Sequence, residues 1–109
     1  MGQYRDGALF TSKFAGTGAW ERHPNGQEVV HVLDGAAMLD LVPMNGDPQS
    51  ISVKAGMMVV VPQGTWHRFR SAEGITLMTA TPRPSEHGRL DIDDPRTVEP
   101  PTQQQGGSR

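Results

Sequence analysis

The sequence of 109 residues contains no cysteine, which excludes disulfide bonds, thiolate metal sites and cysteine nucleophiles. Aromatic residues are scarce, with three Phe, two Trp and one Tyr, so a core must be built mainly from Val, Leu, Ile and Met. No apolar stretch has the length of a membrane span, and the start of the chain lacks the apolar core of a signal peptide. We therefore expect a cytoplasmic protein with no membrane partner.

A strong charge of either sign is also absent, since ten basic and twelve acidic residues leave a net charge of −2. Such a chain has no basic field to attract nucleic acid, so we expect no nucleic-acid partner. Its length fits one domain with a modest core. A small domain with 35% hydrophobic residues gains stability by covering one face with a second copy, and we expect a homodimer.

Turn residues, by contrast, are abundant, with 13 Gly and 9 Pro. Between them, apolar residues alternate with polar ones or form short blocks, which is typical of β-strands. The run 57–61 is continuously apolar and predicts a strand that is covered on both faces. We expect strands at 28–33, 36–42, 50–54, 57–61, 66–70 and 75–81, the second being the hairpin partner of the first. This pattern predicts an all-β domain, either a sandwich or a small barrel.

The strand pattern fades toward the end of the chain. Residues 93–109 contain three Pro, a run of three Gln and a Gly-Gly-Ser sequence. A segment of this composition cannot bury enough apolar area to offset the entropy of ordering it. We expect one β-barrel domain at 1–92 and a disordered, flexible tail at 93–109.

Two short segments combine turn residues with side chains that bind metals, and the first spans residues 20–28. Glu21 and His23 are two residues apart, so on a strand they project from the same face. The turn sequence 24–26 (Pro-Asn-Gly) then lets Glu28 return on a neighbouring strand and face the same interior. Gly35 follows Glu28 after six residues.

The second segment runs from Gly56 through Pro62 and Gly64 to His67, with five, one and two intervening residues. Pro-Gln-Gly at 62–64 predicts a tight turn in which Gly64 adopts a positive φ and delivers His67 from a third strand. The two segments together supply imidazole nitrogens and carboxylate oxygens, the donors that suit a divalent metal: Glu21, His23, Glu28 and His67.

In these two segments the chain resembles the small, single-domain members of the cupin superfamily. Those proteins carry Gly, five residues, His-x-His, three or four residues, Glu, six residues and Gly, and later Gly, five residues, Pro-x-Gly, two residues, His, three residues and Asn. Here Glu21 replaces the first His, Ser71 replaces the Asn, and the upstream glycine is Gly16 or Gly18. The resemblance covers residues 5–85 and implies a jelly-roll β-barrel that binds one divalent metal ion through Glu21, His23, Glu28 and His67.

Glu21 has three readings. As a ligand it completes a set of two histidines and two carboxylates, harder than the three-histidine set usual in the family, which favours iron, manganese or zinc. If it does not bind, His23, Glu28 and His67 form the two-histidine, one-carboxylate face of non-haem iron oxygenases, and Glu21 serves as general base. In the third reading Glu21 faces solvent beside an arginine. The metal stays open among Fe, Mn, Zn, Ni and Cu.

The expected pocket wall consists of side chains that share a face with the ligands or lie near them: Val30, Val32, Met38, Phe69 and Met78. Such an apolar wall favours a small, uncharged or aromatic substrate. His31 falls on the opposite face of its strand, at the surface or a dimer interface, and His87 is expected to be solvated. Trp20 and Trp66 adjoin ligand candidates and are expected to point away from the interior.

Three functions are open at this point. The first is a metal-dependent enzyme acting on a small carbonyl or enol-type substrate; similar cupins include dioxygenases, isomerases, lyases and cyclases, so the resemblance does not select the reaction. The second is a non-catalytic barrel that binds or senses a small ligand, with or without metal. The third is a dimeric scaffold in which the metal is structural.

Overall fold

The computed structural model describes residues 2–5, 7–88, 92–97 and 102–104. Within them the chain forms one nine-stranded sheet and one turn of 3-10 helix, η1 (Pro95–Thr97). The strands are β1 (Gln3–Tyr4), β2 (Gly7–Thr17), β3 (Glu21–Arg22), β4 (Glu28–Val42), β5 (Gln49–Lys54), β6 (Met58–Val61), β7 (Trp66–Pro82), β8 (Ser85–His87) and β9 (Thr102–Gln104). The all-β prediction is confirmed, and no helix in the described ranges is long and apolar enough to span a membrane.

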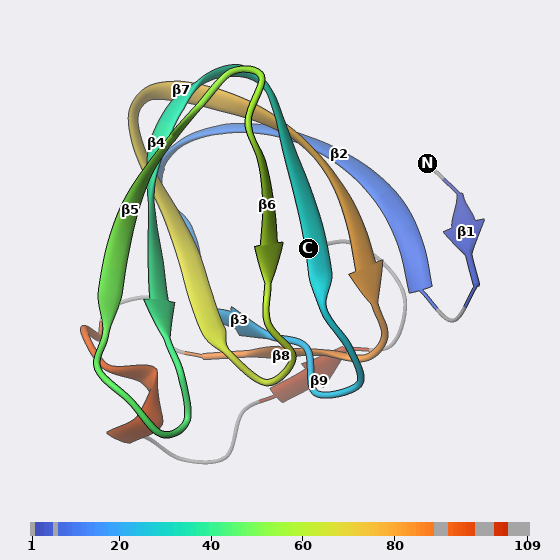
Figure 1. The fold of residues 1–109 in the computed structure, drawn as a ribbon, viewed down its shortest axis with the longest axis vertical. Coiled ribbons are helices and arrows are strands. Elements are labelled where there is room, and N and C mark those ends of the chain that lie inside the picture. The colour runs from blue at the N-terminus through green and yellow to red at the C-terminus, as the bar shows by residue number, and fades with distance from the viewer. Residues whose placement is uncertain (1, 6, 89–91, 98–101, 105–109) are drawn as a thin grey trace.

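Two long strands, β4 and β7, form the centre of the sheet. They pair antiparallel along nearly their whole length and bend over together at the top of Figure 1. Gly35 lies at the bend with φ of +82°, and a Cβ there would be 2.2 Å from the carbonyl oxygen of Gly74. The expectation that 28–33 and 36–42 form a hairpin is therefore wrong. Both belong to one bent strand, because each half pairs with β7 rather than with the other half.

The other long strands extend this central pair on both sides. β2 pairs with β7, and β5 and β6 pair with different halves of β4, so the sheet curls around an apolar interior (Figure 1). Alternate residues of these strands point inward and make up the main core: Val30, Val32, Ala37, Leu39, Val53, Val61, Phe69, Ile75 and Leu77. The predicted small β-barrel is confirmed.

β6 differs from the expectation. Its apolar run predicted cover on both faces, but Met58 and Val60 are 65% and 52% exposed. Among the described strands β6 pairs only with β4, so it is an edge strand whose outer face is open. Leu33 and Met57 are exposed as well, and the homodimer stays a prediction.

A smaller apolar cluster lies apart from the main core and contains Trp20, Val42 and Trp66, with Ile92 packed against it. The indole N–H of Trp20 donates to the backbone carbonyl of Ile92, with an N···O distance of 2.8 Å. The two tryptophans therefore form an outer packing layer, in agreement with the alternation of the sequence.

Two parts of the predicted tail are described. In η1, Arg96 donates to the backbone carbonyls of Pro43 and Gly46 at 3.0 and 2.9 Å, which attaches this segment to the turn after β4. Further on, β9 pairs with β8. The remaining tail residues, 98–101 and 105–109, lie outside the described residues, and the domain boundary at residue 92 stays a prediction.

Candidate metal centre

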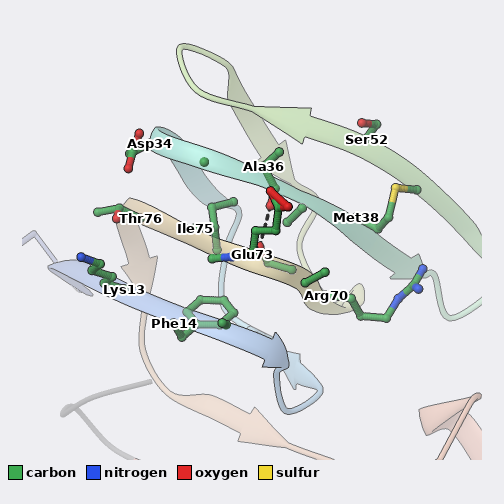
Figure 2. A pocket seen from close by; sticks show the side chains of 16 residues that line it. Lys13, Phe14, Asp34, Ala36, Met38, Ser52, Arg70, Glu73, Ile75 and Thr76 are labelled. Carbon is green, nitrogen blue, oxygen red and sulfur yellow. Dashed lines mark hydrogen bonds between the residues drawn. The ribbon is translucent and has the colours of Figure 1, made fainter.

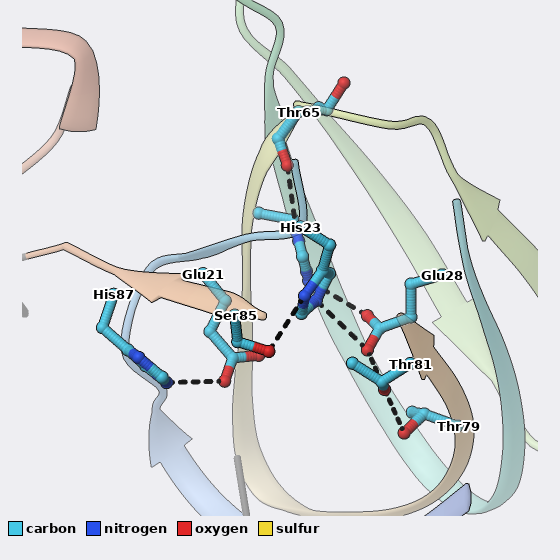
Figure 3. Close-up of polar contacts among 9 residues, drawn as sticks. Glu21, His23, Glu28, Thr65, Thr79, Thr81, Ser85 and His87 are labelled. Carbon is cyan, nitrogen blue, oxygen red and sulfur yellow. Dashed lines mark hydrogen bonds and ion pairs between the residues drawn. The ribbon is translucent and has the colours of Figure 1, made fainter. Parts of the chain in front are cut away.

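The four predicted ligand residues come together inside the barrel (Figure 3). Glu21 lies on β3, His23 follows it, Glu28 begins β4, and His67 is the second residue of β7. Their exposed fractions are 6%, 2%, 0% and 1% in that order. Glu21 is thus not the solvent-facing carboxylate of the third reading, because it is buried beside the histidines.

Strand register brings these side chains together. Glu21 lies directly opposite His67 in the antiparallel pair of β3 and β7. The expected return of the chain from β3 to a paired β4 is wrong, since the described partners of β3 are β7 and β8. Gly64 adopts the predicted positive φ, +76°, and its N–H donates to the carbonyl of His23 with an N···O distance of 3.0 Å. This bond ties the two ligand-bearing loops to each other.

The ligand atoms converge at short distances. Nε2 of His23 lies 3.3 Å from Oε2 of Glu28, and Nε2 of His67 lies 3.0 Å from its Oε1. One donor atom each from Glu21, His23 and His67 also fall within 4.8 Å of one another. Two donors bound to one ion at about 2.1 Å, with angles of about 90–110°, are roughly 3.0–3.4 Å apart. The two histidine contacts with Glu28 have the separations expected of ligands that share a metal ion.

Hydrogen bonds to the outer atoms of His67 and Glu28, away from the point where the donors converge, orient both side chains. Nδ1 of His67 lies 3.1 Å from the carbonyl oxygen of Thr65, which can only accept, so Nδ1 carries a proton, and in the neutral imidazole Nε2 presents its lone pair. Thr81 donates its hydroxyl to Oε2 of Glu28 at 2.6 Å, and Thr79 lies 3.0 Å from the Thr81 hydroxyl. Because the Thr81 proton goes to the carboxylate, Thr79 donates to Thr81.

The unbonded histidine nitrogens and the charge of the four side chains show whether these residues fit a metal. Among the described residues, Nε2 of His23 and Nε2 of His67 make no hydrogen bond although both are fully buried. In the neutral imidazole, the lone pair of His67 faces the Glu28 carboxylate at 3.0 Å, and a cation between them would remove the repulsion. Two neutral histidines and two carboxylates would also leave a divalent ion formally neutral. The residues therefore fit a divalent metal ion.

Two residues of β8 also touch the centre, and neither was predicted from the sequence. Nε2 of His87 lies 3.2 Å from Oε2 of Glu21, and Oγ of Ser85 lies 3.1 Å from Nδ1 of His23. The expectation of a solvated His87 is therefore wrong, because β8 pairs with β3 and carries this side chain against Glu21. No local motif marks such a contact between residues 66 positions apart.

A cavity of about 380 Å³ opens beside the centre. Its wall is formed by residues of β2, β3, β7 and β8 and of the loop after β2: Ser12, Lys13, Phe14, Gly18, Ala19, Glu21, His67, Arg68, Phe69 and His87. The rings of Phe14 and Phe69 meet edge to face, with centroids 6.4 Å apart. The cavity thus combines an aromatic side with two of the ligand candidates, and its volume suits a small molecule.

Of the five predicted wall residues, Phe69 lines this cavity. Val30 and Val32 face inward as predicted but are closed into the main core. Met38 lines a separate, larger hollow over the bend of the sheet (Figure 2), which contains none of the ligand candidates among its lining residues. Met78 is half-buried and alternates with inward Leu77 on β7, so it faces away from the interior.

Arg68, one of the charged side chains at the cavity wall, is paired with Asp40. It donates to Oδ2 of Asp40 at 2.9 Å, and its guanidinium stacks over the ring of Trp20 at 4.4 Å. Burial alone would raise the pKa of Asp40, but hydrogen bonds from Arg70, Ser50 and Arg68 outweigh it and lower that pKa to about 2. Arg68 is therefore held as part of the scaffold.

A curled sheet whose interior gathers two histidines and two carboxylates defines a class of protein, the small β-barrel with a candidate metal centre. Comparison with known families is more specific, because the sequence pattern of the cupin domain matches residues 9–79. The chain belongs to the cupin family. The predicted resemblance is confirmed, and β8 falls outside the matched stretch.

Individual relatives cover part of the chain. It is 30% identical over 71 residues to the uncharacterized protein YdbB of Bacillus subtilis (strain 168), covering 65% of this chain and 59% of YdbB. It is 39% identical over 51 residues to acireductone dioxygenase of Rhodopseudomonas palustris (strain TIE-1), covering 47% of this chain and 30% of that enzyme. The chain thus spans less than two thirds of either curated relative. A solved cupin-2 domain protein from Shewanella frigidimarina (NCIMB 400) matches with a TM-score of 0.59 at 28% identity over 74% of both chains.

Proposed function

We propose that this protein is a metal-dependent enzyme, of the dioxygenase type, that acts on a small apolar or aromatic substrate bearing a carbonyl or enol oxygen. The observation that carries the proposal is the convergence of His23, Glu28 and His67. Nε2 of His23 and Nε2 of His67 lie 3.3 and 3.0 Å from the two Glu28 carboxylate oxygens, and within the described residues neither Nε2 is hydrogen-bonded. Glu21 is the fourth ligand in this proposal.

The chemistry that a divalent ion supplies when bound here is polarisation of a carbonyl or enol oxygen and, for a redox-active ion, activation of dioxygen. The chain's own residues have two further tasks. Phe14 and Phe69 offer an aromatic side against which the apolar body of the substrate packs. Glu21 and His67 belong both to the ligand set and to the cavity wall, so they place a substrate held in the cavity beside the ion.

One relative and the size of the cavity support this proposal. Acireductone dioxygenase, by its name an oxygen-using enzyme, is 39% identical over 51 residues of this chain. That match covers 30% of the enzyme's length. The enzyme's name therefore suggests a class of substrate for this chain and not a particular compound. The cavity of about 380 Å³ lies at the small end of ligand sites, which favours a compact substrate.

The test is oxygen consumption by protein reconstituted with Fe²⁺, Mn²⁺, Ni²⁺ or Zn²⁺ and incubated with enediols, catechols and other enols. We expect turnover with a redox-active ion, and a loss of at least about a hundredfold in His67→Ala and Glu28→Ala, since each removes a ligand. His31→Ala is the matched control, because His31 lies on the face of β4 opposite Val30 and Val32. Turnover that survives both ligand variants would overturn the proposal.

The non-catalytic reading remains the alternative outcome. A compound that binds the wild-type protein tightly, with metal dependence but without consumption of oxygen or conversion, would replace the enzyme by a ligand-binding barrel. Metal dependence of folding with no ligand bound would instead favour a structural metal.

A further inference from the structure

We propose that β8 is a positioning strand, in which His87 holds the Glu21 carboxylate and Ser85 holds the His23 imidazole in the orientation needed for metal binding. The proposal rests on the metal site proposed above, but it concerns residues outside the stretch that matches the cupin family, 9–79. It therefore assigns a role to a segment that the family pattern does not reach.

The register of β8 carries the inference. Glu21 pairs with His87 and Arg22 pairs with Glu86 in the antiparallel ladder of β3 and β8. Because side chains alternate along a strand, Ser85 and His87 share one face, and that face is turned toward the ligands (Figure 3). Both inward side chains of this three-residue strand therefore contact a different ligand candidate.

The opposite face of β8 fixes this register. Arg22 donates through Nε to Oε1 of Glu86 at 2.6 Å, and its guanidinium lies 4.7 Å from the centre of the Trp66 ring. The backbone N–H of Gly88 donates to the carbonyl of Trp20 at 2.9 Å. A slip of one residue would break these contacts and turn Glu86 toward the centre instead of Ser85 and His87.

The chemistry explains why this chain needs such a strand. Glu21 stands where the family pattern has a histidine, and a glutamate has more rotatable bonds than an imidazole, so it loses more entropy when fixed. A hydrogen bond from Nε2–H of His87 to Oε2 of Glu21, at 3.2 Å, selects one carboxylate orientation. Likewise, Nδ1 of His23 lies 3.1 Å from Oγ of Ser85, and in the tautomer in which Nδ1–H donates to that hydroxyl, Nε2 carries the lone pair.

The experiment measures Co²⁺ binding to the whole metal-free protein by calorimetry and by visible d–d absorption. We expect His87→Ala to weaken Co²⁺ binding about 10- to 100-fold and to shift the d–d bands, because Glu21 is no longer held. His87→Gln keeps an N–H donor and should recover most of the affinity and the wild-type spectrum. His31→Ala, which removes an outward-facing histidine, should leave both readouts unchanged.

A smaller loss, about tenfold, is expected for Ser85→Ala, and its circular dichroism spectrum should match the wild type, so the strand is tested even if His87→Ala folds poorly. Unchanged affinity and spectrum in folded His87→Ala and Ser85→Ala would overturn the positioning role while leaving the metal site intact. Wild-type protein that takes up no Co²⁺ would overturn the metal site itself, and with it this inference.

Discussion

Two buried clusters of this barrel each contain acidic side chains, and they differ in which groups pair with those carboxylates. Asp40 accepts hydrogen bonds from Ser50 at 2.6 Å, from Arg68 at 2.9 Å and from Arg70 at 2.7 and 2.9 Å. In the centre formed by Glu21, His23, Glu28 and His67, the outer atoms are hydrogen-bonded, but within the described residues the two histidine Nε2 atoms are not.

This difference separates a structural cluster from a ligand site. Protein donors satisfy the carboxylate oxygens of Asp40. Burial alone would raise the pKa of Asp40, but these hydrogen bonds lower it to about 2. The centre directs the Nε2 atoms of both histidines and the Glu28 carboxylate toward one point, which is the arrangement expected for an ion from outside. The two clusters should therefore respond to different perturbations.

The largest effect should come from metal itself. Adding Zn²⁺ or Co²⁺ to the metal-free protein at about 1,000 times the dissociation constant should stabilise the fold by about 4 kcal/mol, measured as a rise in Tm. His67→Ala should abolish most of this rise, and Asp40→Asn should preserve it. An equal rise in His67→Ala would place the binding site elsewhere.

Breaking the Asp40 cluster should give the next largest effect. Asp40→Ala leaves the guanidiniums of Arg68 and Arg70 without their carboxylate, and we expect a loss of about 3 kcal/mol in the free energy of unfolding by urea. Metal affinity should not change, since none of these three residues is a ligand. Loss of metal binding in a folded Asp40→Ala variant would show that the clusters are not independent.

The pH dependence of stability should report the same cluster. Because the folded-state pKa of Asp40 is below its ordinary value of 3.8, its contribution is fully present above about pH 4 and is lost as pH falls toward 2. The lowering corresponds to about 2 kcal/mol. Urea unfolding between pH 5 and 2 should show this loss in the metal-free protein, and Asp40→Asn should flatten that part of the curve.

The smallest effects come from single hydroxyl donors, one in each cluster. Ser50→Ala removes one donor to Asp40 and should cost about 1 kcal/mol of stability with no effect on metal affinity. Thr81→Val removes the donor to Glu28 and should weaken metal binding about tenfold. Equal effects of the two variants on metal binding would remove the distinction between the clusters.

The features of the candidate centre that could be predicted from the sequence are local ones. Glu21 and His23 are related by strand alternation, and Gly64 sits in a turn whose positive φ the sequence requires. Combined with the cupin pattern, these were enough to place Glu28 and His67 in the same interior.

What the sequence missed depends on long-range pairing. Asp-Gly at 34–35 is a turn signal, yet here it bends one strand, because both of its halves find a partner in β7. His87 follows the barrel in a short segment without periodicity, and only the pairing of β8 with β3 shows that it reaches Glu21. The place of Met38 and Met78 depends on the curvature of the sheet, which alternation alone does not give.

The central claim, that this protein binds a divalent metal ion, is tested most directly by elemental analysis of untagged protein purified without chelator, with His67→Ala purified in parallel. The account predicts about one equivalent of a divalent transition metal per wild-type chain and its loss in the variant. Wild-type protein that carries no metal and takes none up on reconstitution would contradict the account, and Glu21, His23, Glu28 and His67 would then be the polar lining of a barrel that holds some other ligand.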